Sequence, residues 1–315
     1  TKPYDVALKL QEQYGHTVAV RTLGTGITIF TGNPEYVKEI FAMPSDHFTM
    51  MDTPRIEFFF GKRSLFTSEG ETHRRDKKLI FPHFRGDRMR AYAESIVECT
   101  RKLCNQNVGQ GVVSLMHLAQ FTTIEVMLQA LLGVRKQEHL DHLRQVFMGW
   151  NKAQTPFLSL PALHTNLFRP YATFMKYNQE LCDFVQSLIQ ENRAGEGGSD
   201  ILSLMVRSQY EDGSVMEDEH IGDHMRTLLV AGFDTTANTI AWGIDTIFRH
   251  PQVLKRIKDE VDGMSEDMSL DDLSKLPYLD ATCYELMRLR PPLELIPTRK
   301  LSKPLRLGPY ELMPG

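Results

Sequence analysis

Residues 231–236 read AGFDTT and place a glycine, a carboxylate and two hydroxyls inside an otherwise apolar helical pattern. Apolar residues recur at helical spacing on both sides, from Ile221 to Phe248, and predict one long buried helix. Glycine and threonine form helices poorly, and a buried aspartate is costly without partners. The stretch therefore indicates either a functional site or a tolerated kink, in which Thr235 or Thr236 donates to a carbonyl one turn earlier.

A second informative helix is predicted at residues 277–290, which read PYLDATCYELMRLR. Pro277 suits the first turn of a helix, and the proline pair at 291–292 ends it. Glu285 and Arg288 lie three residues apart, so they share a helix face and can pair. Such pairs are common on protein surfaces and contribute little stability. This pattern therefore carries weight only in combination with the first.

The order of these patterns resembles that of the cytochrome P450 superfamily, the heme-thiolate monooxygenases. The matching pieces span essentially the whole chain: Tyr14-Gly15 with the strands that follow, GETHRR at 70–75, AGFDTT at 231–236, Glu285 with Arg288, Arg299, and YELMPG at 310–315. The AGFDTT helix followed by the Glu-x-x-Arg helix is the specific combination. The resemblance implies a mainly α fold with a small β-sheet, as a single incomplete domain at 1–315. Residues 1–69 and 297–315 would supply the β region and 70–296 the helical body.

Local patterns predict the elements of this fold. In chain order they are a helix at 4–14, strands at 17–23 and 27–31 joined by a turn at 24–26, a helix opened by Asn33-Pro34, an apolar loop up to Leu65, mainly helices from Gly70, and strands again after Pro297. Residues 194–199 (AGEGGS) predict a flexible linker. We expect a mainly helical body with one small sheet built from both ends of the chain.

The resemblance implies heme b as the cofactor and gives individual residues roles. Asp234 and Thr235 would form an acid–alcohol relay that delivers protons into a dry pocket, and Gly232 would leave room for oxygen beside the helix. His73 and Lys77 stand where the family uses a Trp or His and an Arg to reach the heme propionates. Lysine supplies the charge of arginine but not its bidentate fork.

Further residues follow from the same resemblance. Arg299 would be the third propionate contact, with a structural salt bridge as the alternative. Glu285 and Arg288 would be structural and would lock their helix behind the heme. The substrate pocket would use apolar side chains, although clustered Phe and Leu residues are usually core: Phe59, Leu65, Ala231, Leu295 and Ile296.

The iron ligand of the family is a cysteine in a Phe-x-x-Gly-x-x-x-Cys-x-Gly loop after the Glu-x-x-Arg helix. The four cysteines of this sequence lie in helical contexts without that motif: Cys99, Cys104, Cys182 and Cys283. We expect the ligand to lie beyond Gly315, together with the arginine that completes the triad of Glu285 and Arg288. The sequence is then part of a longer chain and is expected to be inactive by itself, because the axial ligand makes the chemistry possible.

Composition narrows the class of protein. Hydrophobic residues make up 42% and charged residues 24%, with a net charge of −4, which is ordinary for a globular domain. The acidic balance argues against nucleic acid as a partner. Irregularly spaced cysteines argue against a disulfide scaffold or a zinc module. No run of eighteen apolar residues predicts a membrane span, although an anchor preceding Thr1 is not excluded.

The resemblance also implies partners. They would be a small hydrophobic substrate, O2, and an electron donor, either a ferredoxin or flavodoxin with its reductase or a P450 reductase. His73 in place of Trp favours the soluble bacterial type of the family, which is cytoplasmic. Arg74, Arg75 and Lys78 form a basic face that we interpret as solvated, with docking of an acidic electron-transfer partner as the alternative.

Other readings of the chain remain open. A relative that rearranges peroxides or dehydrates oximes would not need to activate oxygen, but such relatives often lose the acid–alcohol pair. A non-catalytic remnant of the fold is a second possibility. A metal site at Glu138, His139 and His142 would need further ligands beyond two histidines on one helix face.

Overall fold

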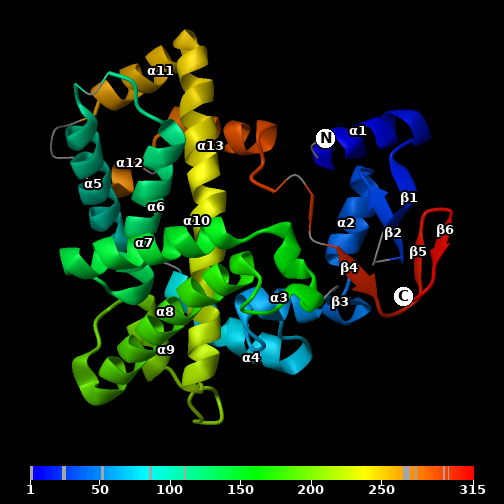
Figure 1. Ribbon diagram of the computed structural model, residues 1–315. Coiled ribbons are helices and arrows are strands. Elements are labelled where there is room, and N and C mark those ends of the chain that lie inside the picture. The colour runs from blue at the N-terminus through cyan, green and yellow to red at the C-terminus, as the bar shows by residue number, and fades with distance from the viewer. Residues whose placement is uncertain are drawn as a thin grey trace. The chain divides into compact units, whose positions relative to one another are not determined.

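The computed structural model describes residues 3–22, 26–50, 53–84, 87–109, 111–264, 270–273, 275–293, 295–296 and 298–315. The chain forms two compact units (Figure 1). Unit 1 consists of Thr1–Arg74 and Leu293–Gly315, and unit 2 of Arg75–Pro292. From the sequence, the corresponding boundaries were expected at 69/70 and 296/297.

Unit 1 combines short helices with pairs of strands. Its described elements are α1 (Pro3–Tyr14), β1 (Thr17–Thr22), β2 (Gly26–Thr31), α2 (Pro34–Ala42), β3 (Phe48–Met50), α3 (Thr53–Phe60), β4 (Arg299–Leu301), β5 (Leu305–Leu307) and β6 (Tyr310–Leu312). β1 and β2 form the predicted antiparallel pair, and the structure places Thr17 opposite Thr31. Residues 23–25, which include most of the expected turn, lie outside the described residues. The Asn33 side chain accepts from the backbone of Glu35 and Tyr36, which is why α2 begins where it does.

The expected small sheet is present as separate two-stranded sheets. Among the described strands, β3 pairs with β4, with Phe48 opposite Leu301, and β5 pairs with β6. Of the described strand pairs, only β3–β4 joins the two ends of the chain. Gly308 forms the β5–β6 turn at φ 57°, and a Cβ there would lie 2.6 Å from Cζ of Tyr36. Glycine therefore permits both the turn and the close approach of α2 to this hairpin.

The expected apolar loop before Leu65 is wrong in part, because residues 53–60 form α3. Phe58, Phe59 and Phe60 are consecutive, so the sequence lacks the alternation of apolar and polar faces that marks a surface helix. The Phe58 and Phe59 rings pack edge to face at 5.1 Å, and the Phe60 ring contacts Phe66 at 5.2 Å. Aromatic packing therefore stabilises a helix that the local pattern does not reveal.

Unit 2 is almost entirely helical. Helix α4 (Gly70–Ile80) begins in unit 1 and continues into unit 2, where the described elements are α5 (Asp87–Asn107), α6 (Leu115–Leu132), α7 (Gln137–Ala153), α8 (Arg169–Glu191), α9 (Ile201–Arg207), α10 (Asp218–Arg249), α11 (Pro251–Asp262), α12 (Leu270–Leu273) and α13 (Pro277–Leu289). Helix α10, yellow in Figure 1, runs the length of the unit and packs against α6, α8, α9, α11 and α13. Both predicted helices that carry the informative motifs, α10 and α13, are present.

The core of unit 2 follows the apolar stripe of α10. Ile221, Met225 and Leu229 are fully buried, as the helical spacing predicted. An aromatic cluster from α7, α8 and α10 fills the space beside them: Phe147, Trp150, Phe174 and Phe233. Phe233, the residue before Asp234, is therefore buried in this core and holds the AGFDTT stretch against α7.

Helix α6 is the one helix in the described residues that is long and apolar enough to cross a membrane. The sequence offered no uninterrupted apolar run here, because His117, Gln120 and Glu125 break it. The helix packs against α5, α9 and α10 and buries Ile124 and Leu128 completely. Core helices of globular proteins pass the same test of length and composition, so the feature is weak support for a membrane span.

The segment expected to be a linker, residues 194–199, lies between α8 and α9. It includes part of a π-helical turn at Asn192–Glu196, and Gly195 has φ 98°. The Gly198 N–H donates to Ser203 Oγ at 3.0 Å, and the Arg207 guanidinium donates to the carbonyls of Gly197 and Gly198. Hydrogen bonds therefore connect this segment to α9.

Candidate functional site

The AGFDTT stretch lies inside the continuous helix α10. The Thr235 hydroxyl donates to the Ala231 carbonyl at 2.5 Å, and the Thr239 hydroxyl donates to the Thr235 carbonyl at 2.8 Å. A hydrogen bond from a threonine hydroxyl to the carbonyl one helical turn earlier is the structural alternative that the sequence analysis gave for this stretch. Because Thr235 uses its proton in this bond, its oxygen keeps lone pairs that can accept a hydrogen bond from a ligand or water.

Asp234 is half-buried on the same helix. Burial raises the pKa of its carboxyl above the ordinary value, while a hydrogen bond from the Asn151 side chain of α7 opposes this shift. In the part of the chain that the structure describes, Asp234 and Thr235 have different partners and do not bond each other. Asp234 is thus an acid that holds its proton more readily than a surface aspartate.

The space beside Gly232 is occupied by Met127 of α6. A Cβ at Gly232 would lie 2.8 Å from Sδ of Met127, so a larger residue here would require the Met127 side chain to move. This gives a packing reason for glycine at this position. The expectation that Gly232 also leaves room for oxygen remains a prediction.

Glu285 and Arg288 pair on α13, which confirms the pairing predicted from their spacing. The Arg288 guanidinium donates to both Glu285 carboxylate oxygens at 2.7 Å. These bonds hold the pKa of Glu285 below its ordinary value. Both side chains are exposed, so the pair by itself adds little to the stability of unit 2.

Helix α13 presents an apolar surface around this pair. None of its residues is fully buried, and Tyr284, Met287 and Leu289 are exposed. Exposed apolar side chains gathered on one helix mark a surface suited to an apolar ligand or another packed element.

The residues predicted to bind propionates are basic and lie near aromatic rings. The Lys77 ammonium lies 5.0 Å from the centre of the Phe81 ring, and the Arg299 guanidinium lies 5.8 Å from the rings of Phe41 and Phe48. His73 is half-buried on α4. No carboxylate among the described residues pairs with Arg299, so the structure gives no support to the salt-bridge alternative.

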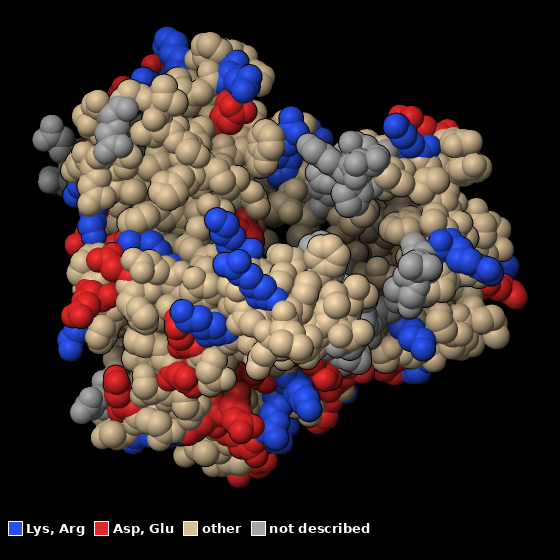
Figure 2. Space-filling model, in the orientation of Figure 1, with Lys and Arg blue, Asp and Glu red and all other residues tan. Residues whose placement is uncertain are grey.

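The basic face predicted on α4 is neutralised by carboxylates. Arg75 pairs with Asp212 at 2.8 Å, Lys78 pairs with Glu211, and Arg74 lies 3.4 Å from Glu71. Figure 2 likewise shows basic and acidic side chains next to one another in the lower part of the face drawn. This pairing favours the interpretation as a solvated surface and weakens the proposal of an acidic docking partner here.

The predicted pocket residues are divided between the two units. Phe59, Leu65, Leu295 and Ile296 belong to unit 1, and Ala231 belongs to unit 2. The first two are half-buried and the next two are exposed. Residues 294 and 297 of the second predicted segment lie outside the described residues. Neither unit alone brings these five residues together, so the pocket remains a prediction.

Three of the four cysteines lie in environments that do not favour an iron-binding thiolate. The four lie on α5 (Cys99 and Cys104), α8 (Cys182) and α13 (Cys283). Burial raises the pKa of the Cys99 thiol to about 11 and raises the pKa values of Cys182 and Cys283 as well. An iron ligand must be a thiolate, which these three environments disfavour. The roles of the α10 residues and of the basic side chains toward a heme remain predictions.

Comparison with known proteins identifies the family to which this chain belongs. The cytochrome P450 family model matches residues 1–315, the whole of this sequence. The chain belongs to the cytochrome P450 family.

Curated relatives carry the same family name. Cytochrome P450 138 of Mycobacterium tuberculosis is 31% identical over 265 residues, which cover 81% of this chain and 59% of that protein. Cytochrome P450 137 of the same organism is 28% identical over 320 residues, covering 98% of this chain and 64% of that protein. This cytochrome P450 chain therefore spans less than two thirds of the length of these relatives.

Solved structures share the fold. The retinoic acid-bound cyanobacterial CYP120A1 matches with a TM-score of 0.86 at 19% identity, over 99% of this chain and 70% of that one. The heme domain of cytochrome P450DA matches with a TM-score of 0.82 at 20% identity, over 100% of this chain and 71% of that one. The expected mainly α cytochrome P450 fold with small sheets is confirmed.

One cluster of this cytochrome P450 chain was missed in the sequence. Asp76 of α4 contacts His220 and His224 of α10. Burial by itself would raise the pKa of Asp76, but its contacts with both histidines and with Tyr210 together have a larger effect and hold that pKa well below its ordinary value. Burial lowers the pKa of His224, so its imidazole is neutral at neutral pH. The spacing of the two histidines, four residues apart, was the available signal. At the metal site considered from the sequence, Glu138 with His139 and His142, the His139 ring packs against Phe184. Among the described residues, no cluster of three metal-binding side chains includes these residues.

Proposed function

We propose that the full-length protein is a heme-dependent monooxygenase that inserts one atom of O2 into a small hydrophobic organic substrate. Membership in the cytochrome P450 family supports heme and oxygen chemistry in general. The observation that supports the finer proposal is that a half-buried acid, Asp234, is followed by a hydroxyl that can accept a hydrogen bond, Thr235, on the central helix of unit 2.

When bound, heme with a thiolate ligand supplies the iron at which dioxygen is reduced and cleaved. The contribution of this chain is to hold and move protons. The Ala231 carbonyl fixes the Thr235 hydroxyl, whose oxygen then accepts a hydrogen bond at a defined point on α10. Asp234, with its raised pKa, carries a proton into a largely apolar region and can release it there.

Basic and apolar surfaces support the binding of heme. Lys77, Arg299 and His73 each stand at a propionate-binding position of the family, and Lys77 and Arg299 carry the positive charge that such a contact needs. The exposed apolar side chains of α13 suit a group with a large flat apolar face. Glu285 and Arg288 would hold α13 in shape behind that group and would not take part in the chemistry.

We further propose an electron donor of the ferredoxin or flavodoxin type with its reductase, or a P450 reductase. The mycobacterial relatives support a bacterial enzyme of the cytoplasm. The substrate contacts that the family resemblance implies, Ala231 of α10 and the apolar residues of unit 1 named above, stay predictions of this proposal.

The pair on α13 gives a test of heme binding. In the full-length protein, Arg288→Lys is expected to weaken heme binding by no more than roughly tenfold, the effect of losing one charge-assisted hydrogen bond, and so to lower the heme content when heme is limiting. Lysine keeps the charge but cannot make both 2.7 Å bonds to Glu285. Heme content is measured from the heme absorbance relative to the protein concentration.

Arg249→Lys is the matched control, because Arg249 makes a similar exposed contact with Asp245 on α10, at 2.9 and 3.0 Å. It should leave the heme content unchanged. If the wild-type full-length protein binds no heme when heme is supplied, the proposed function is wrong.

A further inference from the structure

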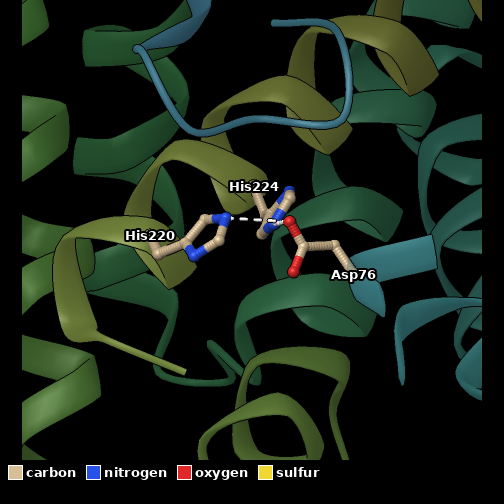
Figure 3. Close-up of side chains that lie close together, drawn as sticks. All are labelled: Asp76, His220 and His224. Atoms are coloured by element: carbon tan, nitrogen blue, oxygen red, sulfur yellow. Dashed lines mark ion pairs between the residues drawn. The ribbon is translucent and has the colours of Figure 1, made fainter. Parts of the chain in front are cut away.

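A buried cluster in unit 2 lies apart from the AGFDTT stretch. Figure 3 shows the Asp76 carboxylate of α4 and the imidazoles of His220 and His224 of α10 turned toward one another. The Nε2 atoms of His220 and His224 lie 2.9 and 3.5 Å from the same carboxylate oxygen, Asp76 Oδ2. One ligand atom from each of the three residues lies within 4.8 Å of the others.

The three groups are buried, and several of their polar atoms make no hydrogen bond of good geometry. The side chains of His224, Asp76 and His220 are 0%, 1% and 12% exposed. Asp76 Oδ2, His220 Nε2 and both ring nitrogens of His224 have no partner in hydrogen-bond geometry. Buried polar atoms without well-formed hydrogen bonds cost free energy, so a group that binds Asp76 Oδ2 and the two Nε2 atoms would stabilise this region.

The other oxygen of Asp76 is already held. The Tyr210 hydroxyl donates to Asp76 Oδ1 at 2.6 Å, and the Arg75 guanidinium covers the Tyr210 ring at 4.3 Å. This fixes the carboxylate and leaves Oδ2 facing the histidines. Carboxylates that bind metals are commonly oriented in this way by a hydrogen bond to the second oxygen.

We propose that Asp76, His220 and His224 bind a divalent transition-metal ion, with zinc as the preferred occupant, through Asp76 Oδ2 and the Nε2 atoms of the two histidines. Zinc takes nitrogen and oxygen ligands at ~2.0–2.1 Å in a tetrahedron, which places ligand atoms ~3.3 Å apart. The contacts of 2.9 and 3.5 Å lie on either side of that value. Water would complete the coordination, and the partly exposed His220 offers the ion a path from the surface.

This site is separate from the acid–alcohol residues of α10. His224 precedes Asp234 by ten residues, or ~15 Å along α10 at 1.5 Å per residue. Asp76 immediately precedes Lys77 on α4. A bound ion would therefore connect α4 to α10 and fix the part of α4 that carries Lys77.

Zinc titration of the full-length protein tests the site. After treatment with a chelator, calorimetry with zinc chloride should give one site per chain, with zinc counted by mass spectrometry separately from iron. His220→Gln and Asp76→Asn should each weaken binding more than about 100-fold, because even residues that only orient a ligand contribute 10–100-fold. Tyr210→Phe should weaken binding by roughly 10–100-fold.

The surface histidines of α7 supply the control. The double variant His139→Gln/His142→Gln removes two exposed imidazoles and should bind zinc like the wild type. Zinc should also raise the melting temperature of the wild type but not of His220→Gln, which reports on binding even where a variant is less stable. Absence of a stoichiometric site in the wild type, or binding that survives both His220→Gln and Asp76→Asn, would overturn the proposal whether or not the protein binds heme.

Discussion

Thr235→Ala in the full-length protein is expected to lower the amount of product formed per electron pair on the order of 100-fold, the usual size of a general acid–base contribution. The variant loses the Thr235 hydroxyl, which accepts a hydrogen bond from a proton donor. The helix is not disturbed, because alanine is a better helix former than threonine. Heme content and the rate of electron consumption should change much less than product formation. The measurement compares product, consumed reductant and heme in one reaction.

Thr239→Ala is the matched control for this prediction. Thr239 lies four residues further along α10, is half-buried like Thr235, and makes the same type of bond, from its hydroxyl to the Thr235 carbonyl. We expect its coupling to stay close to that of the wild type. Equal coupling in Thr235→Ala and wild type would show that Thr235 serves only the helix, and the relay assignment would fall.

Phe147→Ala is expected to reduce the free energy of unfolding by about 3–5 kcal/mol, the range for truncating a buried aromatic residue. Phe147 is fully buried, and its ring contacts Phe233 at 5.0 Å and Trp150 at 5.8 Å. The cavity would adjoin Phe233, the residue before Asp234, so the position of the relay would loosen as well. Denaturant unfolding measures this change in the free energy of unfolding, provided that its dependence on denaturant concentration is the same in the variant and the wild type.

Phe157→Ala provides the comparison, because Phe157 lies in the same unit but is exposed. Its loss should change the free energy of unfolding by no more than about 0.5 kcal/mol. Similar costs for the two variants would mean that the aromatic cluster of α7, α8 and α10 is not the core of unit 2.

Local patterns in the sequence predicted the elements whose signals are local. The apolar spacing of α10, the prolines around α13 and the Asn33 cap each act within a few residues, and the structure contains all three elements. The pairing of β3 with β4 joins residues near 50 to residues near 300, and no local pattern encodes it. Helix α3 was missed because consecutive phenylalanines hide the helical period and only packing reveals it.

The candidate site divides in the same way. The Glu285–Arg288 pair follows from spacing on one helix and is confirmed. The Asn151 partner of Asp234 and the Met127 side chain beside Gly232 come from neighbouring helices, so the sequence could not reveal them. The meeting of Asp76 with His220 and His224 likewise depends on the packing of α4 against α10. The roles of Asp234, Thr235, Lys77 and Arg299 toward heme remain predictions.

The source of the oxygen in the product tests the proposed activity most directly. The full-length protein is supplied with an electron donor, a panel of small hydrophobic compounds and ¹⁸O2, and every product is analysed by mass spectrometry. A monooxygenase places one ¹⁸O atom in each product molecule and the other in water, which is the result we predict. A product that is an isomer or a dehydrated form of its substrate, or that takes its new oxygen from water, would contradict the account.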